Sequence, residues 1–479
     1  MKAQALLATS LVAFLAACGT SNVAPQTDAS VADAGANVGD ANVSDENNSD
    51  TGSPDAAGSL HVRSVVAGAG YTCVILDDNS VKCWGNNADG QLGLGDQNNR
   101  GDSPNEMGDI LPKVDLGKGR TAKTLSAGGH TCVILDDNSV KCWGNNTFFG
   151  QLGQGDTNNR GDSPNEMGDK LPKVDLGAGR TAKAISVGDA HTCVILDDNS
   201  VKCWGNNADG QLGLGDQNDR GDSPNEMGDM LPKVDLGAGR TAKTLSAGGR
   251  NTCAILDDDS VKCWGYNRYG ELGLGDQNRR GGAPKEMGDM LPKVDLGTGR
   301  TAKALSARGG YSCVILDDGN VKCWGYNDFA GLGLGDTSNR GDAPKEMGDM
   351  LPKVDLGTGR TAKAISAGAY HTCAILDDNG VKCWGENGVG ELGLGDTSDR
   401  GDAPNEMGDM LASVDLGTGR IAVGVSVGSS HTCVNLDDNS VKCWGDNHVG
   451  KLGLGDIKDR GDAPKEMGDM LPKVDLGTK

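Results

Sequence analysis

Short apolar runs recur along most of the chain, each bounded by Gly, Asp, Asn or Pro. Residues 192–196 and 201–204 are one pair of such runs, rich in Val, Ile and Leu, and both are predicted to be β-strands. Asp197-Asp198-Asn199 lies between them and suits a three-residue hairpin loop that ends in a left-handed residue. The apolar positions follow no helical period, so the pattern predicts β-structure built on tight hairpins.

This hairpin recurs seven times, at a spacing of about 60 residues that is typical of repeat architectures. A strand precedes each hairpin, as in 183–187, and a Gly- and Asp-rich excursion follows it, ending in a short apolar segment such as 232–236. Four short strands per repeat predict one four-stranded antiparallel sheet each. The first and last repeats lack the polar character of solenoid caps, so we expect the sheets to close into a ring. The predicted fold is all-β: a seven-bladed β-propeller over residues 60–479.

Each hairpin carries one pair of cysteines. With the turn centred on Asp198, Cys193 lies opposite Cys203, at a separation that a disulfide can bridge. Reduced core thiols and metal ligands are the alternatives, although no repeat supplies the further ligands that a zinc site needs. The sequence therefore predicts seven disulfides: Cys73–Cys83, Cys132–Cys142, Cys193–Cys203, Cys253–Cys263, Cys313–Cys323, Cys373–Cys383 and Cys433–Cys443.

The chain begins with Met1-Lys2, a short apolar run and Leu15-Ala16-Ala17-Cys18. These features predict a secretory signal over residues 1–18, too short to span a membrane. The Leu-Ala-Ala-Cys ending resembles the bacterial lipobox, which implies cleavage before Cys18 and its lipidation. Cys18 is also the cysteine left over once seven pairs are assigned among 15. An ordinary signal peptide with a stray cysteine is the alternative.

Residues 19–59 contain seven acidic residues and no aromatic residue, Lys or Arg. Such a segment buries too little apolar surface to fold, so it is predicted to be a disordered acidic linker between a membrane lipid and the repeats. Gly19 after the cysteine resembles Gram-negative lipoproteins that are sorted to the outer membrane. Export agrees with the disulfides, which persist in oxidising compartments.

Each repeat also contains a pattern written in the third repeat as Trp204-Gly205-x-Asn207-x-x-Gly210-Gln211-Leu212-Gly213, followed by Arg-Gly-Asp-x-Pro. These motifs resemble the regulator of chromosome condensation repeat over residues 60–479, and the resemblance implies a seven-bladed propeller. Nuclear members of that family exchange nucleotide on a small GTPase and bind chromatin. The formal net charge of −22 opposes binding to a phosphate backbone, so we expect neither exchange activity nor a nucleic-acid partner.

Several patterns in the repeats would suggest chemistry if each stood alone. Arg-Gly-Asp at 220–222, Gly-x-x-Gly-x-Gly at 210–215 and the histidine two residues before Cys193 all recur in other repeats, which favours structural roles. The long loops also contain acidic residues that could supply oxygen ligands for calcium: Asp216, Asp222, Glu226 and Asp229. Their spacing fits no calcium loop, but the sequence does not decide whether a calcium ion binds there. We expect no catalytic residues, no cofactor and no metal, and a monomer.

Two short windows carry most of the variation between repeats: the connection before each first cysteine, and the residues after each tryptophan. Because strand directions alternate, both windows are expected at one end of the blades, and the Asp-Asp-Asn turns at the other. Every Phe and Tyr of the repeats lies in these windows, as is typical of recognition surfaces, although unconstrained drift is the alternative. The predicted binding residues are Phe148, Phe149, Arg268, Tyr269, Tyr326 and Phe329.

The sequence thus predicts an exported, lipid-anchored, non-catalytic propeller on the envelope of a Gram-negative bacterium. Its varied loop ends would bind a protein or a glycan. An inhibitor of a secreted enzyme and a structural or adhesive surface coat are the alternatives. An enzyme would need a carboxylate pair or a triad confined to one repeat, and no repeat stands out in this way.

Overall fold

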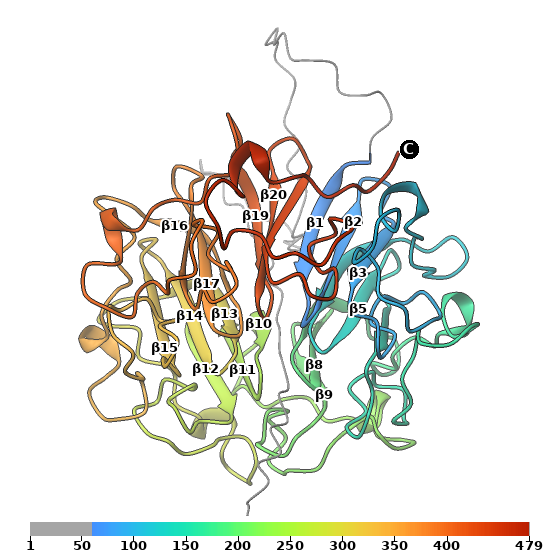
Figure 1. The fold of residues 1–479 in the computed structure, drawn as a ribbon. Helices are drawn as coiled ribbons and strands as arrows, with labels where there is room; N and C mark the ends of the chain where they lie inside the picture. Colours follow the sequence, from blue (N-terminus) through green and yellow to red (C-terminus); the bar gives the residue numbers. More distant parts are fainter. Residues whose placement is uncertain (1–59, 479) are drawn as a thin grey trace, which may run out of the picture.

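The computed structural model describes residues 60–478, which form seven small antiparallel sheets. Figure 1 shows the sheets set side by side around a central axis. The chain passes once around this ring, so that the first strand, β1 (blue), lies beside β19 (red) of the last repeat. Each sheet comes from one repeat, and we number the sheets blade 1 to blade 7 in chain order. The predicted seven-bladed propeller is confirmed.

Each blade has three strands in chain order, and the first strands of neighbouring blades contact each other near the axis. The inner strands are β1 (Val62–Ala67), β4 (Ala122–Ala127), β7 (Ala182–Val187), β10 (Ala242–Ala247), β13 (Ala302–Arg308), β16 (Ala362–Ala367) and β19 (Ala422–Val427). The middle strands are β2 (Tyr71–Leu76), β5 (His130–Leu135), β8 (His191–Leu196), β11 (Asn251–Leu256), β14 (Tyr311–Leu316), β17 (His371–Leu376) and β20 (His431–Leu436). The outer strands are β3 (Val81–Gly85), β6 (Val140–Gly144), β9 (Val201–Gly205), β12 (Val261–Gly265), β15 (Val321–Gly325), β18 (Val381–Gly385) and β21 (Val441–Gly445).

A three-residue 3₁₀ helix follows each sheet, in the long excursion after the outer strand. These helices are η1 (Gly108–Ile110), η2 (Gly168–Lys170), η3 (Gly228–Met230), η4 (Gly288–Met290), η5 (Gly348–Met350), η6 (Gly408–Met410) and η7 (Gly468–Met470). They lie at the periphery of the ring (Figure 1).

The hairpin of each blade has the predicted geometry. In blade 3 the Leu196 amide donates to Ser200 O, and Asn199 closes the turn with a φ of 62°. Cys193 pairs with Cys203 across β8 and β9, with their Cα atoms 4.1 Å apart. All seven predicted disulfides are present.

The prediction of a fourth strand in each blade is wrong. Residues 232–236 run beside β9 but make one backbone bond to it, from the Val234 amide to Val201 O at 2.9 Å. Pro232 has no amide to donate, and Leu236 O accepts from the Lys262 ammonium of the next blade at 3.0 Å. Blade 6 has Ala412 in place of the proline, but Leu416 O there also accepts from the next blade, from the Lys442 ammonium at 3.0 Å. Each sheet stops at three strands.

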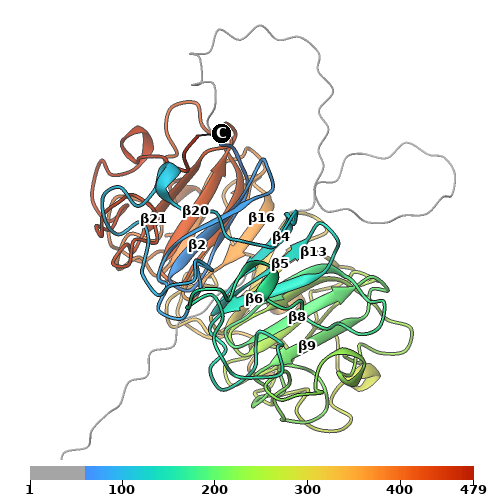
Figure 2. The same cartoon turned by 90° about the vertical axis from the view of Figure 1, so that its right-hand side faces the viewer.

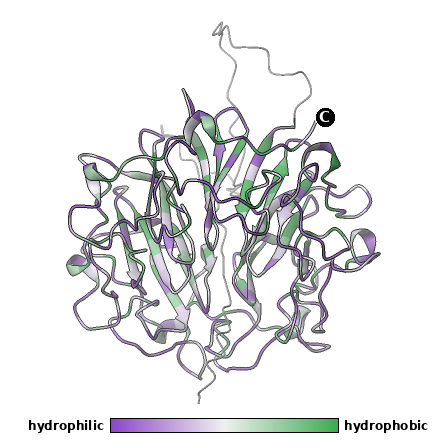
Figure 3. Cartoon of the chain, in the orientation of Figure 1, coloured by the Kyte–Doolittle hydropathy of each residue, from purple (hydrophilic) through white to green (hydrophobic). Residues whose placement is uncertain are grey.

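The hydrophobic core consists of the interfaces between neighbouring blades. One buried cluster joins Cys132 and Val140 of blade 2 to Leu196 and Trp204 of blade 3. The Trp204 indole donates to Gln151 O at 2.9 Å, so each tryptophan also fastens its blade to the preceding one. Figure 3 shows apolar residues along the strands and polar residues in the outer loops.

A constant glycine explains why the loop after each tryptophan packs so tightly. A Cβ atom at Gly153 would lie 2.8 Å from the Trp204 indole nitrogen, at a φ of +66°. The glycine-rich motif therefore serves packing between blades, as predicted.

The ring closes by the same contacts that join the other blades. The Trp84 indole of blade 1 donates to Lys451 O of blade 7 at 3.0 Å, and the Lys82 ammonium donates to Leu476 O at 2.8 Å. Figure 2 shows β2 beside β20 at this junction. Each sheet is complete within its own repeat, so closure needs no exchange of strands between the ends of the chain.

The predicted signal peptide, the lipidated Cys18 and the acidic linker lie outside the described residues. Within residues 60–478 the structure contains no helix that is both long and apolar enough to cross a membrane.

Candidate ligand-binding site on the loop face

The two ends of the blades differ in what they carry. At one end, here called the loop face, the two variable windows meet: the Asn206 amide after Trp204 donates to Ala190 O before β8 at 2.8 Å. At the other end, here called the turn face, the Asp-Asp-Asn turn contacts the Gly-Arg connection, with Arg180 and Asp198 2.9 Å apart. This arrangement is the one expected from alternating strand directions.

A constant asparagine holds each long loop while its neighbours vary. The Asn207 side chain donates to Asp216 O at 2.9 Å and accepts from the Leu212 amide at 3.0 Å. Arg220 of the Arg-Gly-Asp triplet forms an ion pair with Asp216 at 2.7 Å, which confirms that this arginine braces the loop. Residues beside Asn207 are therefore free to change without loss of the loop's shape.

Five aromatic side chains from blades 4, 5 and 6 form a continuous row on the loop face. We call Tyr266, Tyr269, Tyr326, Phe329 and Tyr370 the aromatic ladder. Successive ring centroids are 6.4, 5.0, 6.1 and 4.5 Å apart. Rings at these separations support one another at tilted or edge-on angles.

The structure brings together four of the six predicted binding residues. Tyr269, Tyr326 and Phe329 belong to the ladder, and the Arg268 guanidinium lies 5.7 Å from the centre of the Tyr269 ring. Phe148 and Phe149 form a separate pair on blade 2, with centroids 6.1 Å apart and Phe148 75% exposed.

Two tyrosines in the variable windows are core residues instead. Tyr71 and Tyr311 are each only 1% exposed. The Tyr71 hydroxyl accepts from Thr131 of the next blade at 2.8 Å, and the Tyr311 hydroxyl donates to His371 O. Window position alone therefore does not distinguish a surface ring from one buried between blades.

A pocket of about 240 Å³ opens beside the ladder, lined by residues of blades 3 to 6. Besides ladder tyrosines, its lining includes Asp189, Arg250, Asn251 and Glu271, none of which was among the predicted binding residues. The sequence held a signal for some of them. Glu271 stands where blades 1 to 3 have Gln, and Arg250 where other blades have Gly, Ala, Tyr or Ser.

Apart from the arginine that braces each long loop, the arginines of the loop face are confined to two neighbouring blades, a feature that was not predicted from the sequence. Arg250, Arg268, Arg279 and Arg308 have no arginine at the equivalent positions of other blades, and all four come from blades 4 and 5. Arg250 and Arg279 both pair with the buried Asp209, at 2.5 and 2.8 Å. The Arg250 guanidinium also lies 4.9 Å from the centre of the Tyr266 ring.

Buried acids with unpartnered oxygens border the pocket. Glu271 is 1% exposed; one carboxyl oxygen accepts from the Tyr269 amide at 2.8 Å, while Oε1 has no hydrogen-bond partner. Burial raises the pKa of Glu271 to about 7. Burial also raises the pKa of Asp189 well above its usual value, although Arg308 and Arg250 act in the opposite direction.

The histidines near the cysteines have structural partners. His130, His191, His371 and His431 are fully buried, and each Nε2 is hydrogen-bonded to a threonine of the next blade, as in His191–Thr252 at 2.9 Å. This geometry agrees with the predicted packing role. Within residues 60–478, no group of three or more His, Cys, Asp or Glu is placed to hold a metal ion.

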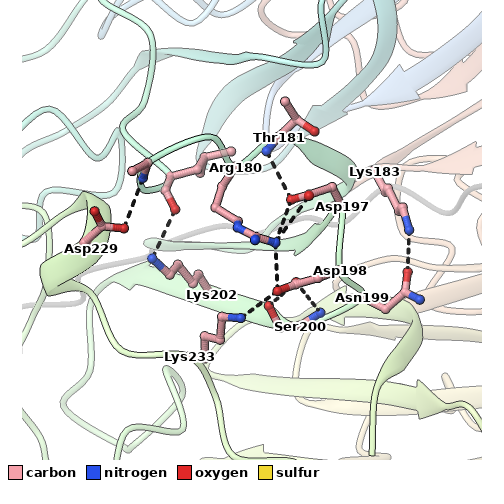
Figure 4. A network of polar contacts seen from close by, with 12 residues as sticks. Arg180, Thr181, Lys183, Asp197, Asp198, Asn199, Ser200, Lys202, Asp229 and Lys233 are labelled. Atoms are coloured by element: carbon pink, nitrogen blue, oxygen red, sulfur yellow. Dashed lines mark hydrogen bonds and ion pairs between the residues drawn. The ribbon is translucent and has the colours of Figure 1, made fainter.

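The turn face is a repeated polar network (Figure 4). Asp198 accepts from Ser200 and pairs with Arg180 and Lys233, the latter at 2.6 Å. The buried Lys202 ammonium donates to Leu176 O at 3.1 Å and to Gly228 O at 2.6 Å. These groups are satisfied within the protein, so the turn face holds the blades together and the loop face carries the candidate site.

Fold and site together define a seven-bladed propeller with a row of aromatic rings and a pocket at one end of its blades. Family models of the regulator of chromosome condensation (RCC1) repeat match residues 62–91, 128–151, 182–211, 242–271, 362–391 and 422–451, and a second model of the same repeat matches 318–375. The chain belongs to the regulator of chromosome condensation repeat family.

Curated relatives share this repeat region. The ultraviolet-B receptor UVR8 of Arabidopsis thaliana is 28% identical over 403 residues, which cover 83% of this chain and 79% of the receptor. The E3 ubiquitin-protein ligase HERC2 of Homo sapiens is 23% identical over 71% of this chain, but that match spans only 6% of HERC2. The similarity to HERC2 is therefore confined to a small part of that ligase.

Solved structures with this fold include human WBSCR16, with a TM-score of 0.59 and 21% identity, covering 79% of this chain and 87% of that one. Prp20p of Saccharomyces cerevisiae, whose structure was described with its binding to Gsp1p and histones, has a TM-score of 0.57 and 18% identity, covering 76% and 80%. At these identities the structures support the fold alone.

Proposed function

We propose that this chain is an exported, non-catalytic binding propeller that holds a protein or glycan partner on its loop face. The observation that supports the proposal is the aromatic ladder, five rings from three blades beside a pocket at one end of a disulfide-braced scaffold. Aromatic residues and arginine on a rigid support are typical of binding hot spots. The oxidising compartment that seven disulfides require is consistent with export.

The proposal includes a membrane anchor. Residues 1–18 would be the signal, lipidation of Cys18 would attach the mature chain to the outer membrane of a Gram-negative bacterium, and residues 19–59 would tether a monomeric propeller of residues 60–479. Expression of the full chain and of Cys18→Ser in a Gram-negative host tests this part. We expect the wild type in the membrane fraction and the variant in the soluble periplasmic fraction; retention of the variant in the membrane would contradict the anchor.

Binding is tested with variants that borrow residues from other blades. Tyr266→Asn, Tyr269→Asp and Tyr326→Asn place on blades 4 and 5 the residues found at the same positions of blades 1 and 3. Because those residues already fit this loop, the triple variant should fold. Purified full chain, wild type or triple variant, is incubated with envelope extracts of the host, and we expect the variant to lose the partners that the wild type retains.

Equal retention by the two proteins would contradict a binding role for the ladder. The proposal that the chain is not an enzyme needs a separate test, because buried carboxyl groups beside a pocket are also found in active sites. Release of reducing ends from envelope polysaccharide by the wild type, and its loss in Glu271→Gln, would overturn that part.

A further inference from the structure

The pocket beside the aromatic ladder has the size of one ring-shaped group. Its volume of about 240 Å³ lies below the roughly 300–1,000 Å³ typical of sites for whole drug-sized ligands. Tyr266, Tyr269, Tyr326 and Tyr370 line it, and Phe329 continues the row between Tyr326 and Tyr370. The pocket has room for one ring-shaped group of a ligand, and the row of aromatic rings beside it could contact further groups of the same kind. This arrangement suits a ligand built as a chain of similar ring-shaped groups.

Several acceptor oxygens in the pocket lining have no donor. Glu271 Oε1, Asn251 Oδ1 and both carboxylate oxygens of Asp189 are buried and have no hydrogen-bond partner, and Glu271 and Asn251 are each only 1% exposed. Buried acceptors are normally satisfied, and each one left without a donor destabilises the structure. A ligand that carries several donors in different directions would satisfy these acceptors from two blades at once.

The charges around the pocket are largely matched within the protein. Arg250 pairs with Asp209 at 2.5 Å. Burial raises the pKa of Asp189, while the nearby Arg308 and Arg250 act in the opposite direction. The Arg250 guanidinium already lies against the Tyr266 ring, where a cationic ligand would otherwise bind. Burial raises the pKa values of Glu271 and Asp189, so the site disfavours charge, and an added cation would also be repelled by Arg250. The pocket therefore favours a neutral ligand.

We propose that this pocket binds an uncharged sugar unit of a glycan chain. The C–H faces of the sugar ring pack against the ladder tyrosines, and its hydroxyls donate to Glu271, Asn251 and Asp189. Neighbouring units of the chain lie along the ladder towards Phe329. This inference rests on the proposed function and narrows the choice between a protein and a glycan partner.

The experiment uses the purified full chain on a printed array of uncharged, acidic and amino-sugar glycans, with saturation-transfer NMR on the glycans that are retained. We expect uncharged oligosaccharides to bind and to show transfer to their ring C–H protons. Tyr266→Asn/Tyr326→Asn should weaken binding by about tenfold or more, because two rings no longer pack against the sugar. Glu271→Gln should also weaken it, and the fold should tolerate it because Gln91, Gln151 and Gln211 occupy the same position.

The matched control is Val449→Ala, at the blade 7 position equivalent to Tyr269. It should bind as the wild type does. Circular dichroism and thermal melting confirm that each variant is folded.

The outcomes separate this inference from the proposed function. We call Tyr266→Asn/Tyr326→Asn the ladder variant. If uncharged glycans do not bind to the wild type, or bind equally to the ladder variant, the inference is wrong. If the ladder variant instead loses only charged glycans or a protein partner, the inference is wrong and the proposed function holds. If the ladder variant retains every partner, both are wrong.

Discussion

The two faces of the propeller use polar residues in opposite ways. On the turn face, Lys202, Arg180 and Asp198 recur in nearly every blade and are satisfied by partners within the protein. On the loop face, Asp189 and Arg250 each occur in one blade, and the acid at Glu271 occurs in two. Acceptor oxygens of Asp189 and Glu271 are left without partners. Repetition therefore marks residues that hold blades together, whereas departures from the repeat mark the candidate site.

The largest effect is expected from Lys202→Met on the turn face. The change removes a buried donor from Leu176 O and Gly228 O, which should lower the free energy of unfolding by about 2–5 kcal/mol. Urea-induced unfolding measures the loss. The control is Lys183→Met in the same blade, an exposed lysine hydrogen-bonded to Asn199, with an expected change within about 0.5 kcal/mol. Similar losses in the two variants would contradict the structural role of Lys202.

A smaller effect is expected when one disulfide is removed by Cys193→Ala/Cys203→Ala. The two cysteines are separated by 10 residues in sequence, and the chain-entropy estimate for so short a loop is at most about 3 kcal/mol. Because the hairpin is also held by its own backbone hydrogen bonds and by both neighbouring blades, the variant should still fold. Its urea-induced unfolding, compared with that of the wild type under oxidising conditions, measures the difference; a loss well above this limit would show that the bridge does more than close its loop.

Glu391→Gln should change how stability depends on pH. Burial raises the pKa of Glu391 from 4.5 to about 8, so the folded wild type retains a proton that the unfolded chain releases. The resulting stability is present below about pH 4.5 and is lost as the pH rises to about 8, at about 1.4 kcal/mol per pKa unit. Glutamine removes this loss, so the melting temperature of the variant relative to wild type should rise between pH 5 and pH 8. A constant difference over this range would contradict the raised pKa.

The smallest effect on stability is expected from Tyr326→Asn on the loop face. Asparagine occupies this position in blades 1 to 3, and the packing of the Tyr326 ring against Tyr269 is worth about 1 kcal/mol at most. Thermal melting should show little change, while partner binding falls. A large loss of stability would mean that the aromatic ladder also holds the blades together. It would contradict the conclusion that this role belongs to the turn face.

Much of the fold could be predicted because its signals are local. The turn residue Asn199, the alternation around it and the opposed cysteines all lie within a few residues of one another. The fourth strand was predicted on the same basis and was wrong, because Leu236 O bonds to Lys262 of the next blade rather than within its own sheet. That bond joins residues of different repeats, which a local pattern does not reveal.

The candidate site was only partly predictable for a related reason. Comparison of the repeats showed which two windows vary and that Tyr269, Tyr326 and Phe329 lie in them. It did not show that Tyr71 is buried between blades, that Phe148 lies apart from the ladder, or that Asp189 and Tyr370 line the same pocket.

The sequence by itself determined the number of blades, the hairpins, the disulfides and the end of each blade at which variation gathers. These features depend on short-range turn chemistry and on strand alternation, which each repeat carries in full. Only the tertiary structure decided which varied side chains meet, which are buried and where a pocket forms. Those outcomes depend on contacts between neighbouring blades, where packing brings together residues about 60 positions apart, as in His191–Thr252.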